Sequence, residues 1–335
     1  MKSWAIRSLL VAVLAVFGGA CSTPSTPTPP PPPPPPPAAP PSLTCVEGIS
    51  RATVNPNGVA VNYDTPPVTA GQGSVTVACT PTSGETFPIG TTEVTCTATD
   101  TLQRTGTCSF SVTVSKLAQL SRTKYLAFGD SMTAGEVTFP VAGASIKGAG
   151  LITKQVVVPS AAYPNVLLRT LQGRYSSQAD QMSVANFGLG GEKAANARDR
   201  FLQALNAVQP EVVLLWHGHN DIPGGLDGAA SGAASEMRIM VQAARGRGMR
   251  VFIGTIAPPR PNGNRTIGQI YVDDFNNRIR ALAAQEGAVV VDLYAGLLSD
   301  VNRYVGVDGL HLTEAGYARV ADLFFQAIQA NFEVR

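Results

Sequence analysis

The feature of this sequence that most restricts its fold is a regular alternation of two kinds of segment over residues 120–335. Short apolar runs rich in β-branched residues alternate with longer segments that have helical, alanine-rich patterns. The predicted strands are Tyr125–Phe128, Ser183–Phe187, Val212–Trp216, Val251–Ile256 and Ala288–Leu293. The predicted helices are Pro164–Tyr175, Ala195–Ala207, Ser235–Arg247, Asp273–Glu286 and Thr313–Ala330. This alternation predicts one layered α/β domain built on a parallel sheet.

The first 20 residues have the organisation of an export signal. Met1–Arg7 is positively charged, Ser8–Phe17 is almost wholly apolar, and Gly18–Ala20 provides the small residues of a cleavage site. The apolar run is about half as long as a membrane-spanning helix must be. We therefore interpret residues 1–20 as a signal peptide. Cleavage would make Cys21 the first mature residue, which resembles bacterial lipoproteins, whose N-terminal cysteine is lipidated; ordinary secretion is the alternative.

Residues 21–42 form a spacer, because after Cys21 they contain only Ser, Thr, Pro and Ala. Such a segment cannot build a core, and it adopts an extended polyproline II conformation of about 3.1 Å per residue. Its roughly 20 residues would therefore span on the order of 60 Å. The predicted location is the cell envelope, as an outer-membrane or cell-surface lipoprotein held to the membrane by its lipid, with free secretion as the alternative.

The charges and cysteines restrict the partners and the compartment. Lysine and arginine total 25 against 23 acidic residues, and the two excess positive charges, Lys2 and Arg7, lie in the signal peptide. The mature chain is therefore neutral, which argues against nucleic-acid binding. Apart from Cys21, all the cysteines fall within a 64-residue segment, and they are Cys45, Cys79, Cys96 and Cys108. An even, clustered set in an exported protein predicts two disulfides.

Residues 43–116 are predicted to be a small all-β domain. Its predicted strands are Val59–Val61, Ser74–Ala78, Thr91–Thr97 and Ser109–Val114. The segments Phe87–Asp100 and Thr107–Val114 resemble the HYR module, an immunoglobulin-like sandwich of extracellular proteins; Leu102–Arg104 departs from its usual Gly-Asn turn. Cys79 and Cys96 flank a strand–turn–strand segment, so we predict that they pair, which leaves Cys45 to pair with Cys108. We expect a spacer or adhesion module with a carbohydrate or protein ligand.

Polar motifs follow four of the elements of the α/β region, where a parallel sheet places its chemistry. Gly129–Gly135 contains Ser131, and the glycine-rich segment Asn186–Glu192 can turn backbone N–H groups toward an anion. His217–Asp221 follows the third strand, and Asp308–His311 precedes the last helix. A serine needs a base to become a nucleophile, and an Asp-x-x-His pair can supply an oriented imidazole.

These motifs resemble the conserved blocks of the GDSL, or SGNH, hydrolase family over about 215 residues. The resemblance implies a nucleophile at Ser131, a base at His311 and an orienting carboxylate at Asp308. It also implies an oxyanion hole formed by the backbone N–H groups of Ser131 and Gly191 and the side chain of Asn220. The expected fold of residues 120–335 is a three-layer α/β/α sandwich with a five-stranded parallel sheet in the flavodoxin-like order 2-1-3-4-5. No cofactor is implied. Met132 replaces the usual leucine, which should affect only packing.

The predicted function is an exported serine esterase acting on small acyl or acetyl esters. Within enzymes the alternatives are a carbohydrate-ester deacetylase and a lysophospholipase, so the substrate is a small ester, a lipid or an acetylated glycan. A different class of function is a surface adhesion lipoprotein with a vestigial hydrolase domain. The presence of all five motif residues argues against decay: Ser131, Gly191, Asn220, Asp308 and His311.

Three further features of the sequence allow more than one interpretation. The pair His217 and His219 can in principle ligate zinc, but we expect a packed His217 and a cleft-lining His219, so no metal is predicted. The connection at residues 136–162 is long enough for a lid or binding loop. Its apolar residues line an acyl pocket or pack against the body, and they are Phe139, Ile146, Leu151, Ile152 and Val156–Val158. Arg260 and Arg265 either meet an anionic substrate or are merely solvated.

Overall fold

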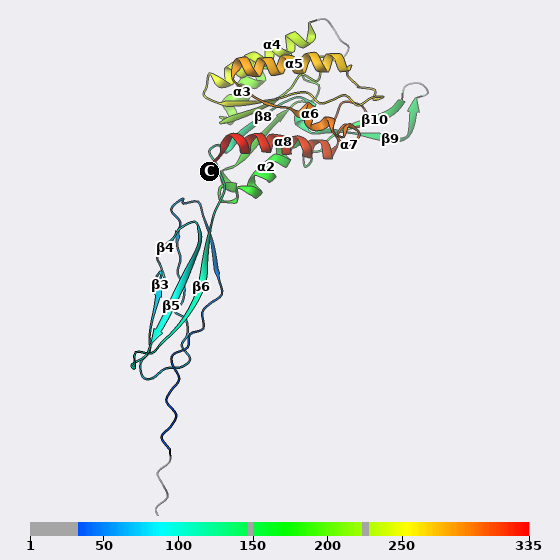
Figure 1. The fold of residues 1–335 in the computed structure, drawn as a ribbon. Coiled ribbons are helices and arrows are strands. Elements are labelled where there is room, and N and C mark those ends of the chain that lie inside the picture. The colour runs from blue at the N-terminus through cyan, green and yellow to red at the C-terminus, as the bar shows by residue number, and fades with distance from the viewer. Residues whose placement is uncertain (1–32, 147–149, 223–227, 335) are drawn as a thin grey trace, which may run out of the picture.

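The computed structural model describes residues 33–146, 150–222 and 228–334. The expected signal peptide, the cysteine at position 21 and most of the spacer lie outside these residues, as do the side chains of residues 142–151. Figure 1 shows a β-rich part, coloured blue to cyan, that leads into a part made of helices around a sheet. Among the described residues, none of the helices combines the length and apolar character that crossing a membrane requires.

The β-rich part contains a four-stranded sheet in the order β1–β6–β5–β3 and a two-stranded sheet of β2 and β4. The strands are β1 (Ile49–Thr53), β2 (Val59–Ala60), β3 (Thr76–Thr80), β4 (Thr86–Phe87), β5 (Gly90–Thr99) and β6 (Thr105–Lys116). Side chains along β5 alternate between exposed and buried, and Val94, Cys96 and Ala98 point inward. Disulfides join Cys45 to Cys108 and Cys79 to Cys96, the pairs expected from the sequence.

The turn between β5 and β6 lacks the usual Gly-Asn pair, and the side chain of an aspartate stabilises it instead. Gln103 adopts a φ of 60°, the left-handed region that glycine or asparagine usually occupies. Asp100 accepts hydrogen bonds from the backbone N–H groups of Leu102 (2.9 Å) and Arg104 (3.0 Å) and pairs with the Arg104 guanidinium. The carboxylate thus satisfies the backbone of a turn whose residue types do not favour it.

The second part contains the predicted five-stranded sheet, and all its neighbouring strands are parallel. The spatial order β11–β8–β12–β13–β14 is the expected 2-1-3-4-5 order. The strands are β8 (Lys124–Gly129), β11 (Ser183–Gly188), β12 (Val212–Trp216), β13 (Arg250–Gly254) and β14 (Val289–Val291). The predicted fold class is therefore confirmed.

Helices cover both faces of this sheet, as the layers in Figure 1 show. The side chains of β12 explain why its sequence is continuously apolar: Val212, Leu214 and Trp216 join the core on one face, whereas Val213 and Leu215 join the core on the other. The first face is covered by α2 (Tyr163–Arg174), α6 (Leu293–Leu298) and α8 (Glu314–Phe332). The second is covered by α3 (Arg198–Val208), α4 (Ala229–Arg245) and α5 (Gln269–Glu286).

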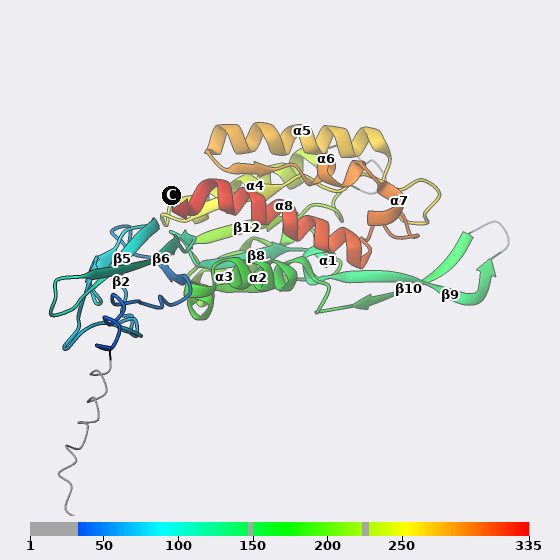
Figure 2. The ribbon, with the colours of Figure 1, turned by 60° about the horizontal axis from the view of Figure 1, so that its bottom comes forward.

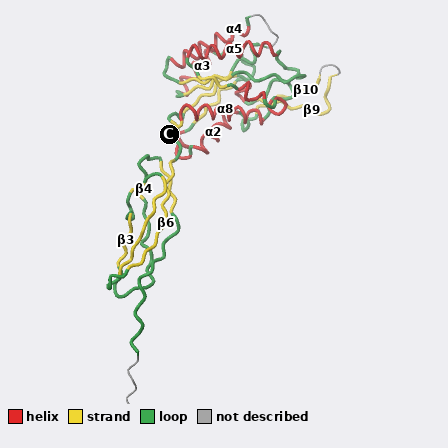
Figure 3. The backbone as a smooth tube through the Cα atoms, viewed as in Figure 1, coloured by secondary structure: helices red, strands yellow, loops and turns green. Residues whose placement is uncertain are grey.

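The long connection after β8 is not an irregular loop. It begins with the short helix α1 (Ser131–Ala134) and then forms an antiparallel hairpin of β9 (Glu136–Ile146) and β10 (Gly150–Val157). Figure 2 shows this hairpin projecting from the body beside α7 (Val301–Tyr304). In Figure 3 its yellow tube stands apart from the strands of the central sheet.

Short elements complete the chain. The 3₁₀ helices η1 (Ser176–Gln181) and η2 (Ala194–Asn196) flank β11, and β7 (Gln119–Leu120) pairs with the C-terminal β15 (Glu333–Val334). The β7–β15 pair ties the entry of the α/β domain to the end of its last helix.

Candidate active site

The residues expected at the site converge at the carboxyl ends of the sheet strands. Ser131 is the first residue of α1, directly after β8, and His311 and Asp308 lie in the segment before α8. The Ser131 Oγ lies 3.0 Å from His311 Nε2, and His311 Nδ1 lies 2.7 Å from Asp308 Oδ2. Serine and histidine are 180 residues apart in the chain. These distances form a continuous hydrogen-bonded chain from hydroxyl to carboxylate.

The turn that presents Ser131 depends on a cap and on close backbone packing. Asp130 caps α1 by accepting a hydrogen bond from Met132 N at 3.0 Å. A Cβ atom on Gly129 would lie 1.9 Å from the Trp216 carbonyl oxygen, and one on Gly188 would lie 2.0 Å from Ala134 N. Gly129 is therefore required by the close approach of the end of β12, and Gly188 by the close approach of α1.

Asp308 is held as an anion by the groups around it. Burial opposes its ionisation, but hydrogen bonds from the His311 ring and the backbone outweigh this, so the pKa of Asp308 is below its ordinary value. Its Oδ1 accepts from the N–H groups of Leu310 (3.2 Å) and His311 (3.1 Å). The loop geometry thus fixes both the carboxylate and the imidazole that it contacts.

The expected oxyanion donors lie on three different segments. Neither Ser131 N nor Gly191 N donates to an acceptor among the described residues. Gly191 has a φ of 73° and open space where a side chain would begin. The Asn220 amide donates to the Glu192 carbonyl oxygen at 3.0 Å, which joins the loop after β12 to the glycine-rich loop after β11.

An ionic network that the motifs did not predict supports the glycine-rich loop. Arg200 of α3 pairs with Glu192 and donates to the carbonyl oxygens of Phe187 (2.8 Å) and Gly129 (3.2 Å). The Glu192 carboxylate also contacts His217 Nε2 at 3.0 Å. Burial raises the pKa of Glu192, but Arg200 and His217 outweigh burial and lower it. Only the spacing of Glu192 and Arg200 across the loop could have suggested this contact.

The two histidines after β12 are both core residues. His217 is fully buried, and His219, which we expected to line the cleft, is only 1% exposed and packs edge-on against Trp216. His219 Nδ1 lies 3.1 Å from Asp130 Oδ2. In the part of the chain that the structure describes, no three or more His, Cys, Asp or Glu side chains are grouped to hold a metal ion.

The β9–β10 hairpin also contributes to the site, which motif analysis did not reveal. A Glu136 carboxylate oxygen lies 3.8 Å from His311 Nε2, and the Gln155 amide nitrogen lies 3.3 Å from the same atom. Arg265 Nη1 donates to Gln155 Oε1 at 2.8 Å. Arg260, the other candidate for an anionic substrate, instead donates to the carbonyl oxygens of Asn302 and Val305.

The apolar residues of this connection divide between exposed positions and positions that pack against the body. Phe139 and Ile152 are 45% and 39% exposed, and Val157 is also exposed. The side chains of Ile146 and Leu151 lie outside the described residues. Among these positions, Val158 is partly buried against the core.

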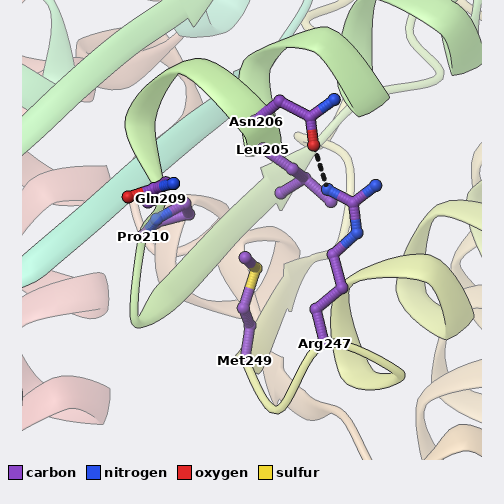
Figure 4. Close-up of a pocket in the computed structure, with 6 residues that line it drawn as sticks. All are labelled: Leu205, Asn206, Gln209, Pro210, Arg247 and Met249. Atoms are coloured by element: carbon purple, nitrogen blue, oxygen red, sulfur yellow. Dashed lines mark hydrogen bonds between the residues drawn. The ribbon is translucent and has the colours of Figure 1, made fainter.

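The pocket drawn in Figure 4 is lined by Leu205, Asn206, Gln209, Pro210, Arg247 and Met249. It has a volume of about 420 Å³, and Arg247 reaches across it to Asn206. Pro210 and Met249, which also line it, precede β12 and β13, so this pocket is at the amino ends of the strands. It is therefore separate from the site around Ser131.

Comparison with known proteins identifies the class of this chain. Residues 127–319, more than half of the chain, match the GDSL-like lipase/acylhydrolase family, and residues 37–114 match the HYR domain. The chain therefore belongs to the GDSL-like lipase/acylhydrolase family and is an ester hydrolase, with an HYR domain before its catalytic domain. Both resemblances predicted from the sequence are confirmed.

Two curated relatives and one solved structure are similar to parts of this chain. Esterase TesA of Pseudomonas aeruginosa is 28% identical over 153 residues, which cover 45% of this chain and 72% of the relative. A putative endoglucanase X of Acetivibrio thermocellus is 25% identical over 36% of this chain and 51% of the relative. The crystal structure of a lipase/acylhydrolase from Enterococcus faecalis superimposes with a TM-score of 0.50 at 18% identity, over 63% of this chain and 97% of that one. This last likeness concerns the fold.

Proposed function

We propose that the protein is a serine esterase whose triad is Ser131, His311 and Asp308. The observation that carries the proposal is the unbroken hydrogen-bonded chain, 3.0 Å from serine to imidazole and 2.7 Å from imidazole to carboxylate. Ser131 Oγ attacks the ester carbonyl carbon while His311 Nε2 takes its proton. Asp308 holds the tautomer in which Nδ1 carries hydrogen, and it stabilises the imidazolium that forms.

The tetrahedral intermediate places a negative charge on the former carbonyl oxygen. In our proposal the N–H groups of Ser131 and Gly191 and the Asn220 amide donate to this oxygen. The intermediate then collapses, the C–O bond to the alcohol breaks, and the departing oxygen takes the proton from His311. Water attacks the acyl-enzyme with His311 again as base, which releases the carboxylic acid and restores Ser131.

Single substitutions test the triad and the oxyanion hole. We expect Ser131→Ala to abolish hydrolysis of p-nitrophenyl acetate, and Asn220→Ala to lower kcat by about 10²–10³, because each removes a group required in the transition state. Circular dichroism and thermal unfolding verify that both variants fold. Wild-type rates in a folded Ser131→Ala variant would refute the assignment of the nucleophile.

We further propose that the enzyme is exported and anchored to the cell envelope through a lipid on Cys21. The two disulfides and the HYR domain fit an extracellular protein. The signal-like N-terminus and the proline-rich spacer would then hold the enzyme away from the membrane. We expect Cys21→Ser to move the protein from the membrane fraction to the soluble fraction and to remove palmitate labelling. Unlabelled wild-type protein in the soluble fraction would favour plain secretion.

A further inference from the structure

We propose that Gln155 and Arg265 bind the alcohol half of the ester and select alcohols that carry free hydroxyl groups, as partially acetylated sugars do. This inference rests on the proposed function, because it starts from the direction in which the product leaves. The departing alcohol takes its proton from His311 Nε2, so it must lie beside that atom. The groups around Nε2 therefore define the subsite for the alcohol.

Those groups are polar and offer both kinds of hydrogen-bonding partner. The Gln155 amide nitrogen lies 3.3 Å from Nε2, and a Glu136 carboxylate oxygen lies 3.8 Å from it. The Glu136 carboxylate is largely buried, and it accepts no hydrogen bond from another side chain or backbone group of the described residues within normal bonding distance. A hydroxyl both donates and accepts, so an amide donor and a carboxylate acceptor that both lie within 4 Å of Nε2 suit a hydroxyl-bearing ligand.

Arg265 fixes the orientation of the Gln155 amide. Because Arg265 Nη1 donates to Gln155 Oε1 at 2.8 Å, the amide nitrogen faces His311 Nε2, and its second N–H is left for a ligand beside that atom. Arg265 is itself exposed, and its backbone N–H donates to the Asp308 carbonyl oxygen at 2.7 Å. Its remaining guanidinium N–H groups are thus presented beside the triad from a loop bonded to the catalytic segment.

The hairpin holds Gln155 in place through its strand pairing. Gln155 lies opposite Thr138 in the antiparallel β9–β10 ladder. Side chains alternate along a strand, so the exposed neighbour Lys154 points to the other face of the hairpin. Lys154 is therefore a matched control: it is a long polar residue on the same strand but outside the proposed subsite.

The experiment compares two acetate esters whose alcohols differ mainly in hydroxyl groups. Cyclohexyl acetate has a bare ring, whereas a monoacetylated methyl xyloside has a ring with free hydroxyls, and release of acetate measures both. In the wild type we expect the sugar ester to be the better substrate. For Gln155→Met and Arg265→Met we expect the ratio of kcat/KM on the sugar ester to kcat/KM on cyclohexyl acetate to fall at least tenfold. Both side chains also lie close to the His311 ring, at 3.3 Å and 3.5 Å, so a smaller fall on both esters can accompany this change in the ratio. Lys154→Met should stay within twofold of the wild type on both esters.

Other results of this experiment would overturn either the inference or the proposed function. An equal fall on both esters would show that Gln155 only positions His311, and an unchanged sugar-ester rate would show that it recognises nothing; either result overturns the inference. A wild type that hydrolyses cyclohexyl acetate but not the sugar ester also overturns it and leaves the serine esterase intact. Activity of Ser131→Ala in the same assay would instead refute the proposed function. Both targets are exposed, and thermal unfolding verifies that the variants fold.

Discussion

At the scale of single residues, Asp130 is a fully buried carboxylate next to the nucleophile. Burial raises its pKa, but the rings of His219 and His217 and the Met132 N–H outweigh burial and lower it to about 2. A carboxyl whose pKa is lower in the folded than in the unfolded state stabilises the fold above its unfolded pKa. That stabilisation is lost as the pH falls from about 4 toward 2.

We therefore predict that Asp130→Asn lowers the free energy of unfolding at pH 7 by about 2 kcal/mol, because it removes this charge from its buried partners. The difference from the wild type should narrow as the pH is lowered from 4 to 2. Urea unfolding of both proteins at several pH values measures this difference in the free energy of unfolding. Asp180→Asn is the control, since Asp180 is exposed and should change stability by less than about 0.5 kcal/mol. A pH-independent difference would contradict the role of the charge.

The residues of the site differ in how far the sequence could predict them. Ser131 and His311 stand in short motifs whose chemistry is local, so residue types and spacing were enough to select them. Gln155 became part of the site only through a contact with His311 across 156 residues, and no local pattern marks it. His219 was misplaced because the sequence does not show that Trp216 and Asp130 enclose its ring.

At the scale of elements, the strands of the central sheet were the best predicted, because burial on both faces makes an inner strand such as β12 a continuous apolar run. The first residues of the helices were predicted less accurately than the strands. α4 begins at Ala229, six residues before the predicted start at Ser235. The prediction began too late because Ser231 and Gly232 interrupt the helical pattern of the sequence there. Both types disfavour helix interiors by propensity, and tertiary packing outweighs that preference here.

The β9–β10 hairpin was missed for a related reason. Its first strand contains Pro140 and its residues are rich in glycine, both of which indicate a loop. A two-stranded ribbon tolerates proline, because each strand has an outer edge whose N–H groups need no partner. Pro140 lies opposite Thr153, at the point where the register of the ladder shifts between Leu151 and Thr153, and proline is also tolerated at such irregularities. The sequence thus located the connection that reaches the site but not its structure.

At the scale of the whole molecule, the HYR domain and the hydrolase domain have separate cores. The core of the first includes Phe87, Val94 and Val112, and it shares no residue with the two cores that enclose the central sheet. A domain of about 70 residues buries too little surface to be robust alone. Both disulfides lie in this small domain, where restriction of the unfolded chain has most effect.

This separation predicts that the two domains can be destabilised independently. The Cys45–Cys108 bridge spans 63 residues and the Cys79–Cys96 bridge spans 17, so their loop-closure contributions are about 4 and about 3 kcal/mol. We expect Cys45→Ser/Cys108→Ser to lower the unfolding temperature of the HYR domain more than Cys79→Ser/Cys96→Ser. Esterase activity should stay within twofold, because the triad is supported by the other cores.

Tryptophan fluorescence separates the two domains in the mature chain. The sequence contains two tryptophans, Trp4 in the expected signal peptide and Trp216 in the hydrolase core, so fluorescence of the mature protein reports only the hydrolase domain. Calorimetry reports both domains. In the cysteine variants the calorimetric transition of the HYR domain should shift to lower temperature while the Trp216 transition stays in place. If the Trp216 transition shifted with it, the two domains would unfold as one cooperative unit, contrary to the separation of their cores.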